Sequence, residues 1–278
     1  MGLRISTNLS SMAASRLLVK NSEDQNKSYE RLSSGQRINH SGDDAAGLAI
    51  AENLRSEIRS MGQAERNAND SISFAQVAEG GLTEISSILI RLRELGIQAA
   101  SDTIGDRERG FINEEVKSLM QEVDRISNVT SFNGTPLLNG QSSKGKLSFQ
   151  VGIQNTKEDR IEFDTEAYDV RSNVLGIHSL SFDTVEGAYD GMGKLDEAMG
   201  KVLSIRSSLG AMQNKLQSAV RSLNLTKENL SIARSRIADT DIASETSELV
   251  RTNILQAAGI AVLAQANTAP AQALKLIA

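Results

Sequence analysis

The sequence predicts a mainly α-helical fold: a long antiparallel coiled-coil-like helical hairpin rod with a small β-hairpin near the mid-chain turn. Three observations predict it. Apolar residues stand seven apart from Leu195 to Ile237, a heptad repeat typical of packed helices. Small and apolar residues from 61 to 126 recur in steps of three and four. Residues 147–154 and 161–163 instead alternate apolar and polar side chains with a period of two, which indicates strands.

Composition excludes several classes of partner and site. The 278 residues carry a formal net charge of −5 and no long basic run, which argues against nucleic acid as the main partner. The chain has no Cys, so neither a disulfide framework nor a thiolate site can form. The stretch MGLRISTNLSSMAAS at the N-terminus has no apolar core of signal-peptide length. We therefore expect that export, if it occurs, follows a route that does not use that signal.

Residues 1–39 form a marginal amphipathic segment. Its first part is rich in Ser and Asn, which lowers helix propensity. The apolar residues recur at roughly helical spacing: they are Ile5, Leu9, Met12, Leu17, Leu18 and Leu32. A similar segment stands at the other end of the chain, so we expect the two ends to pair.

A break in the helical pattern covers residues 33–42 and precedes Asp43 and Asp44. An Asp at this position can cap the next helix and complement its dipole. A metal site with His40 is the alternative, with less support because it has a single imidazole. The helix that follows is predicted over residues 45–100.

The predicted helix over 45–100 carries a long buried stripe, and after a break at 101–105 the same spacing continues. Many residues in the stripe are small, so neighbouring helices can approach closely. The stripe comprises Met61, Ala64, Ala68, Ser71, Ala75, Ala78, Leu82, Ile85, Leu89, Leu92, Gly96 and Ala99, followed by Ile112, Val116, Leu119, Val123 and Ile126.

Residues 128–165 change character. The pairs Asn133-Gly134 and Asn139-Gly140 are turn signals. Apolar residues then alternate with polar ones from 147 to 154 and again at 161–163, which predicts a β-hairpin or small meander at about 145–165. Residues 166–192 contain several glycines and are predicted to be irregular.

The returning helix carries the heptad seam. A period of 3.5 residues predicts left-handed packing against other helices. The seam comprises Leu195, Val202, Leu209, Leu216, Leu223, Leu230 and Ile237.

The C-terminal tail from Ile254 to Ala278 contains one charged residue, Lys275. Gln and Asn side chains and Pro270 interrupt the apolar run, so we expect no membrane insertion. Ordering the tail costs more than its own apolar burial returns. We therefore expect it to be disordered alone and to order when several neighbouring helices cover it. Its large aliphatic residues are Ile254, Leu255, Ile260, Val262, Leu263, Leu274, Leu276 and Ile277.

Motifs for catalysis are missing from the sequence. The two imidazoles, His40 and His178, do not form an HExxH pattern, and no P-loop or GxSxG occurs. We therefore expect neither an enzyme nor a cofactor.

Four long stretches of the chain form a recognisable set of motifs. They are RLSSGQRINHSGDDAAGLAIAENLRS at 31–56, NDSISFAQVAEGGLTEISSILIRLRELGIQAAS at 69–101, EVDRISNVTSFNGTPLL at 122–138 and ENLSIARSRIADTDIASETSELVRTNILQAAGIAVLAQANTAPAQALKLI at 228–277. In these stretches the chain resembles bacterial flagellin. These motifs are long and specific, and they cover both arms and most of the chain.

The resemblance implies a two-layer filament subunit. Residues 1–42 and 240–278 would form an inner terminal coiled-coil layer, and residues 43–239 an outer layer with no separate variable domain. It also implies unfolded export through the flagellum-specific type III channel to an extracellular flagellum used for motility. The implied partners are further copies of the chain, a chaperone on the C-terminal tail, and hook-associated and cap proteins. Assembly is then expected to couple to folding of the terminal arms.

The resemblance further implies a patch that a host innate receptor recognises, at Arg91, Leu95 and Glu115. A second interpretation is that these residues mainly make contacts between subunits. For the whole chain, a hook–filament junction protein and a helical signalling rod both stay open at this point as rival functions.

Overall fold

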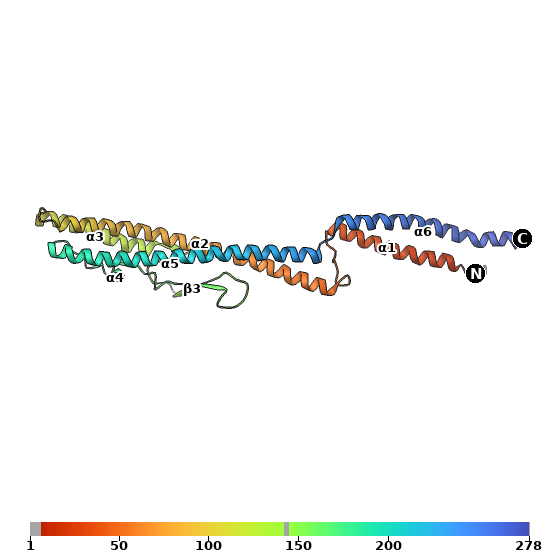
Figure 1. The fold of residues 1–278 in the computed structure, drawn as a ribbon, viewed down its shortest axis with the longest axis horizontal. Coiled ribbons are helices and arrows are strands. Elements are labelled where there is room, and N and C mark those ends of the chain that lie inside the picture. The colour runs from red at the N-terminus through yellow and green to blue at the C-terminus, as the bar shows by residue number, and fades with distance from the viewer. Residues whose placement is uncertain (1–6, 142–144, 278) are drawn as a thin grey trace. The chain divides into compact units, whose positions relative to one another are not determined.

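The computed structural model describes residues 7–141 and 145–277, with side chains up to residue 268. The chain divides into two compact units, Met1–Ser56 with Asn229–Ala278 and Glu57–Glu228. Its helices are α1 (Leu9–Ser34), α2 (Ala45–Ala99), α3 (Asp106–Val129), α4 (Ser172–Leu175), α5 (Val185–Ala238) and α6 (Ile242–Ile277) (Figure 1).

In the first unit, α1 and α6 lie side by side, and both chain ends lie at the same end of the pair (Figure 1). Gly35 adopts a left-handed conformation with φ of 69° and ends α1, a role that Gly fills without a Cβ clash. A short antiparallel bridge then joins Gln36 to Asp239. The prediction that the two ends of the chain pair is confirmed.

In the second unit, α2, α3 and α5 run side by side (Figure 1) and enclose a continuous apolar core. Every residue of the stripe predicted over 61–99 is buried, because small side chains on α2 let α3 and α5 approach. On α3 the prediction is partly wrong: Met120 and Ser127 are buried, whereas Leu119 and Ile126 are half-buried. The buried positions on α3 keep heptad spacing, because Arg109, Val116 and Val123 are seven apart and so are Asn113, Met120 and Ser127. The second of these rows lies one residue later than predicted.

Burial of the heptad seam on α5 declines along the helix. Leu195, Val202, Leu209 and Leu216 are buried, while Leu223, Leu230 and Ile237 are half-buried. The cause is the length of α3, which ends at Val129. The next residue, Thr130, lies beside Gly81 of α2. The hydrogen bond from Gln213 to Glu79 places residue 213 of α5 close to this level of α2. Past it, α5 therefore packs without the third helix.

The mid-chain excursion holds two antiparallel hairpins, β1 (Ser131–Phe132) with β2 (Thr135–Pro136) and β3 (Lys146–Gln150) with β4 (Arg160–Asp164). The predicted hairpin at about 145–165 is confirmed, with Leu147 opposite Phe163. At the Asn133-Gly134 turn both residues have positive φ, 48° and 75°, as the tightest hairpin turns require. Strand β3 ends before Ile153, earlier than the alternation predicts, because the Asp159 carbonyl accepts both Val151 N and Gly152 N.

Aromatic rings fix the larger hairpin to α2. The Phe74 ring of α2 meets Phe163 edge-on with the centroids 4.8 Å apart, and it meets Phe149 in the same way at 5.1 Å. Such edge-to-face pairs add to the stability that burial provides. The hairpin is therefore part of the core of its unit rather than a loose appendage.

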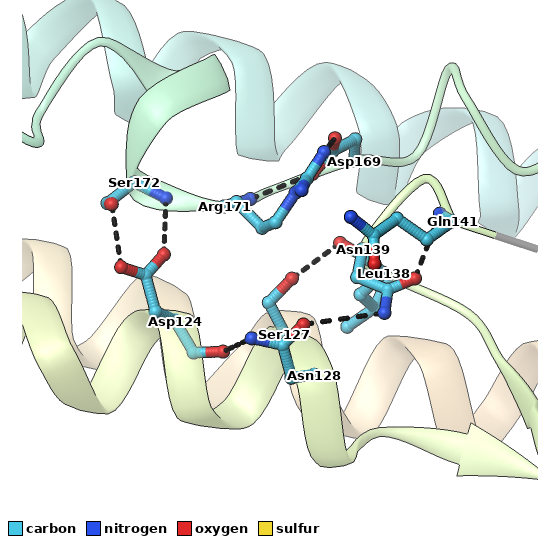
Figure 2. A network of polar contacts seen from close by, with 9 residues as sticks. All are labelled: Asp124, Ser127, Asn128, Leu138, Asn139, Gln141, Asp169, Arg171 and Ser172. Atoms are coloured by element: carbon cyan, nitrogen blue, oxygen red, sulfur yellow. Dashed lines mark hydrogen bonds and ion pairs between the residues drawn. The ribbon is translucent and has the colours of Figure 1, made fainter.

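A polar network fixes the remainder of the excursion to α3 (Figure 2). Asp124 accepts hydrogen bonds from Ser172 N and Ser172 Oγ, both at 2.8 Å, and so caps α4. Ser127 Oγ donates to the Leu138 carbonyl at 2.6 Å. Arg171 forms a bidentate pair with Asp169. Helix α5 then begins at Val185, inside the region predicted to be irregular.

Candidate assembly surface

Helix α1 is positioned by its caps and by a narrow buried stripe. Asn8 accepts a hydrogen bond from Ser11 N at 3.0 Å and caps the N-terminus. The buried residues of α1 are Ala14, Gln25 and Ser28. They are small or polar, so the stripe supplies little of the apolar burial that stabilises helices in folded domains.

Polar side chains fix the register of α1 against α6. Asn8 Nδ2 donates to the Ala266 carbonyl at 2.8 Å, and Asn21 Nδ2 donates to the Thr252 carbonyl at 2.8 Å. A third tie joins Gln25 to Asn253. Because a sliding of one helix would leave buried amides unpaired, these contacts specify one antiparallel register.

Between these hydrogen bonds, α1 and α6 approach each other closely. A Cβ on Gly259 of α6 would lie 3.0 Å from Leu18 Cδ2 of α1. Beside this contact lies an apolar groove of about 360 Å³, lined chiefly by Ala14, Leu17, Leu18, Leu255 and Val262. The groove shows that two helices alone do not fill the space around their aliphatic side chains.

The large aliphatic residues predicted as assembly residues are exposed in the single chain. Leu263 is half-buried. More than half of the side chain is exposed at Leu9, Met12, Ile254, Leu255, Ile260 and Val262. Ile5 and the side chains of Leu274, Leu276 and Ile277 lie outside the described residues. Leu17, which the sequence placed on the same amphipathic segment, is exposed as well. Sequence reasoning missed the exposed residues Val19 and Val250, whose helical spacing relative to the predicted set could have identified them.

Over Ile242–Thr268, α6 is long and apolar enough to cross a membrane by length and composition, and 6% of the most apolar window is buried. Within the stretch, Glu245, Glu248 and Arg251 occupy its first part and Asn253, Gln256 and Gln265 its second. Polar groups at this density favour a surface shared with other protein helices over contact with lipid hydrocarbon.

The tail is helical in the structure, and its disorder in a free subunit stays a prediction. We expected the tail to order only when several helices cover it. In the structure it is a continuous helix, and the helix that packs along it, within the described residues, is α1. The hydrogen bonds within α6 satisfy its backbone without neighbours, whereas its aliphatic side chains remain exposed.

The patch predicted at Arg91, Leu95 and Glu115 is only partly a surface. Arg91 of α2 forms an ion pair with Glu115 of α3 at 2.8 Å. The hydrogen bonds that Arg91 donates to Glu115, the larger cause, and to Glu94 raise the pKa of Arg91. The prediction is wrong for Leu95, whose side chain is 1% exposed and belongs to the apolar core. Its position on α2 faces the other helices, so its side chain is not available to a receptor.

The acidic pair before α2 acts on the backbone. Asp44 accepts Gly47 N at 2.8 Å, and Asp43 accepts the backbone N–H groups of Asn39 and His40. The His40 N–H, the larger cause, and the Asn39 N–H lower the pKa of Asp43. Among the residues that the structure describes, no three His, Cys, Asp or Glu side chains gather in a group that could hold a metal ion. The geometry supports the capping interpretation over the metal site.

Comparison with known proteins gives the family. Residues 5–143 match the bacterial flagellin N-terminal helical region, and residues 192–277 match the bacterial flagellin C-terminal helical region. A flagellin of Halalkalibacterium halodurans is 40% identical over 273 residues, covering 98% of this chain and 99% of the relative. A flagellar filament 33 kDa core protein of Treponema phagedenis is 38% identical over 287 residues, covering 98% and 99%.

The fold agrees with this match. The crystal structure of Bacillus cereus flagellin superposes with a TM-score of 0.51 at 26% identity, covering 57% of this chain and 88% of that chain. Relatives matched over nearly their whole length favour flagellin over a junction protein or a signalling rod. The chain belongs to the bacterial flagellin family and is a structural subunit of the flagellar filament rather than an enzyme.

Proposed function

We propose that copies of this chain join through the exposed aliphatic faces of α1 and α6. The observation that carries the proposal is that six predicted assembly residues are each more than half exposed on one helix pair. Contiguous apolar surface of this kind marks an interaction site. Residues 1–42 and 240–278 then form an inner layer of the filament, and residues 43–239 form an outer layer in which the α5 seam packs within each copy.

A homopolymer accounts for this surface better than a closed dimer. Aliphatic side chains point out of both helices, from Leu9 on α1 and from Ile254 to Val262 on α6. One neighbour cannot cover two such faces. Repeating the same head-to-tail contact covers them on every side and leaves the assembly open, which gives a filament. The filament then serves as a helical propeller for motility.

Assembly is coupled to ordering of the terminal helices. The α1–α6 contact buries small and polar residues, whereas the large aliphatics gain most of their burial from other copies. Each fully buried aliphatic side chain contributes about 1.5–3 kcal/mol. Contacts with other copies in the filament therefore supply most of the free energy that stabilises α1 and α6 as helices.

The exposed tail also supports the proposed export partners. A chaperone that covers the apolar face of α6 prevents premature association before passage through the type III channel to the cell exterior. Hook-associated and cap proteins cover the same faces on the copies at the two ends of the filament. Arg91 and Glu115, the exposed members of the predicted patch, contact either the next copy or a host innate receptor.

The test compares two variants, each of which introduces one carboxylate at a different position of α6. Val262→Asp puts a charge on the proposed contact face, whereas Ser244→Asp puts the same charge on an exposed polar position in the first turn. We expect Val262→Asp to abolish salt-induced filaments seen by electron microscopy, and Ser244→Asp to retain them. Filament formation by Val262→Asp at the wild-type concentration would overturn the proposed contact.

A further inference from the structure

Among the methionines that the structure describes, Met12 is the most exposed. Its side chain is 56% exposed on α1. Met192 and Met199 are half-buried, and the remaining methionines of the described residues are buried, with exposures of 6% at Met61, 9% at Met120 and 6% at Met212. A soluble oxidant therefore reaches the Met12 thioether before those of the other described methionines, since susceptibility follows exposure.

Met12 also lies on the surface that joins copies. It stands one helical turn from Leu9, which is 61% exposed, on the α1 face that presents large apolar side chains. Residues three and four apart on a helix share a face. If this face is buried in the filament, the thioether passes from water into an apolar contact. Burial of Met12 on assembly rests on the proposed function.

We propose that Met12 is a reversible oxidation site that controls assembly. Hydrogen peroxide transfers one oxygen atom to Met12 Sδ. Its O–O bond breaks, water is released, and the sulfur is oxidised by two electrons while the peroxide is reduced. The product is a sulfoxide, which is polar and chiral in place of an apolar side chain. Burying it without a hydrogen-bond donor opposes association, so the oxidised subunit is excluded from the filament.

Assembly protects the same residue. In the filament the neighbouring copies cover Met12, so peroxide acts on free subunits and spares those already assembled. Methionine sulfoxide reductases, with a thiol as reductant, restore the thioether. The state of Met12 thus separates subunits that can assemble from those that cannot.

The experiment uses the full chain and hydrogen peroxide. Monomers are treated, the oxidised residues are identified by peptide mass spectrometry, and the critical concentration for polymerisation is measured. Oxidation of Met12 is expected to raise that concentration at least about tenfold, and treatment with sulfoxide reductases A and B to restore it. Circular dichroism and the unmodified state of Met61, Met120 and Met212 verify that the second unit stays folded.

Two variants make the result specific. Met12→Leu conserves volume and cannot be oxidised at this position, so it is expected to polymerise equally before and after treatment. Met199→Leu removes a half-buried methionine and is expected to stay as sensitive as the wild type. Peroxide sensitivity of Met12→Leu, or wild-type assembly of subunits oxidised at Met12, would overturn the proposal. Failure of untreated chains to polymerise would instead count against the proposed function.

Discussion

Arg91 and Leu95 lie one turn apart on α2, and the structure separates their roles. Arg91 is exposed and paired with Glu115 and Glu94, whereas Leu95 is buried among the apolar side chains of the core. The motif IRLREL suggests a single patch because the spacing of its residues does not show which of the side chains face the core. Exposure thus depends on how α3 and α5 sit against α2, which spacing alone does not show.

This difference predicts that substitutions at Leu95 and Arg91 have unequal effects on the free energy of unfolding. Leu95→Ala leaves a cavity in the core and is expected to lower the free energy of unfolding by about 2–5 kcal/mol. Arg91→Ala removes an exposed ion pair and is expected to leave the free energy of unfolding close to that of the wild type. Urea unfolding followed by circular dichroism measures both. Equal losses for the two variants would contradict the assignment of Leu95 to the core and Arg91 to the surface.

At the scale of elements, three polar pairs tie α2 to α5 at nearly constant register. Arg93 contacts Asp196, Glu79 contacts Gln213 and Glu65 contacts Lys227. On α2 the three positions are fourteen residues apart, which is two heptads. The heptad pattern alone permits a slip by one heptad, so these pairs add specificity to the antiparallel packing.

The Glu65 pair predicts a pH dependence. The hydrogen bond from Lys227 lowers the pKa of Glu65, so the unfolded chain takes up its proton at higher pH than the folded chain does. The pair therefore stabilises the fold above the usual glutamate pKa of about 4.3, and this contribution is lost as pH falls through the lower folded value.

Thermal unfolding at pH 6 and at pH 3.5 tests this dependence. Glu65→Gln is expected to unfold at a lower temperature than the wild type at pH 6, and the difference is expected to shrink at pH 3.5. Glu84→Gln, at an exposed position on the same helix, is the control and is expected to show no such change. A difference for Glu65→Gln that is as large at pH 3.5 as at pH 6 would contradict the stabilising role of the pair.

The elements that sequence predicted well are those fixed by local chemistry. The stripe from Met61 to Ala99 is visible because buried small residues recur in steps of three and four, and the Asn133-Gly134 turn because its backbone angles favour those two residues. The phase of α3 was partly wrong because Leu119 and Met120 are both apolar. The start of α5 at Val185 was missed because glycines obscure its first turns.

At the scale of the whole molecule, sequence predicted that the chain ends pair but not how they do so. The ties from Asn8, Asn21 and Gln25 reach across more than 220 positions of sequence. Polar residues in a Ser- and Asn-rich segment carry no signal that identifies such partners. The apolar tail, by contrast, was identifiable as a contact surface because its composition departs from that of ordinary chain ends.

The two units also differ in whether their large apolar side chains are buried within a single chain. Leu82, Leu89 and Leu92 are fully buried within a single chain, so we expect the second unit to be stable by itself. The large aliphatics of α1 and α6 are mostly exposed within a single chain. We therefore expect the filament to stabilise the terminal helices, whereas the second unit folds before assembly.

Hydrogen exchange of backbone amides in monomer and filament tests whether the terminal helices order only on assembly. In the monomer we expect amides of residues 9–34 and 242–277 to exchange much faster than those of 82–99. In the filament we expect the same terminal amides to slow by at least about tenfold, while residues 82–99 change little. Terminal amides as protected in the monomer as those of 82–99 would contradict coupled folding and show that the helix pair is stable before assembly.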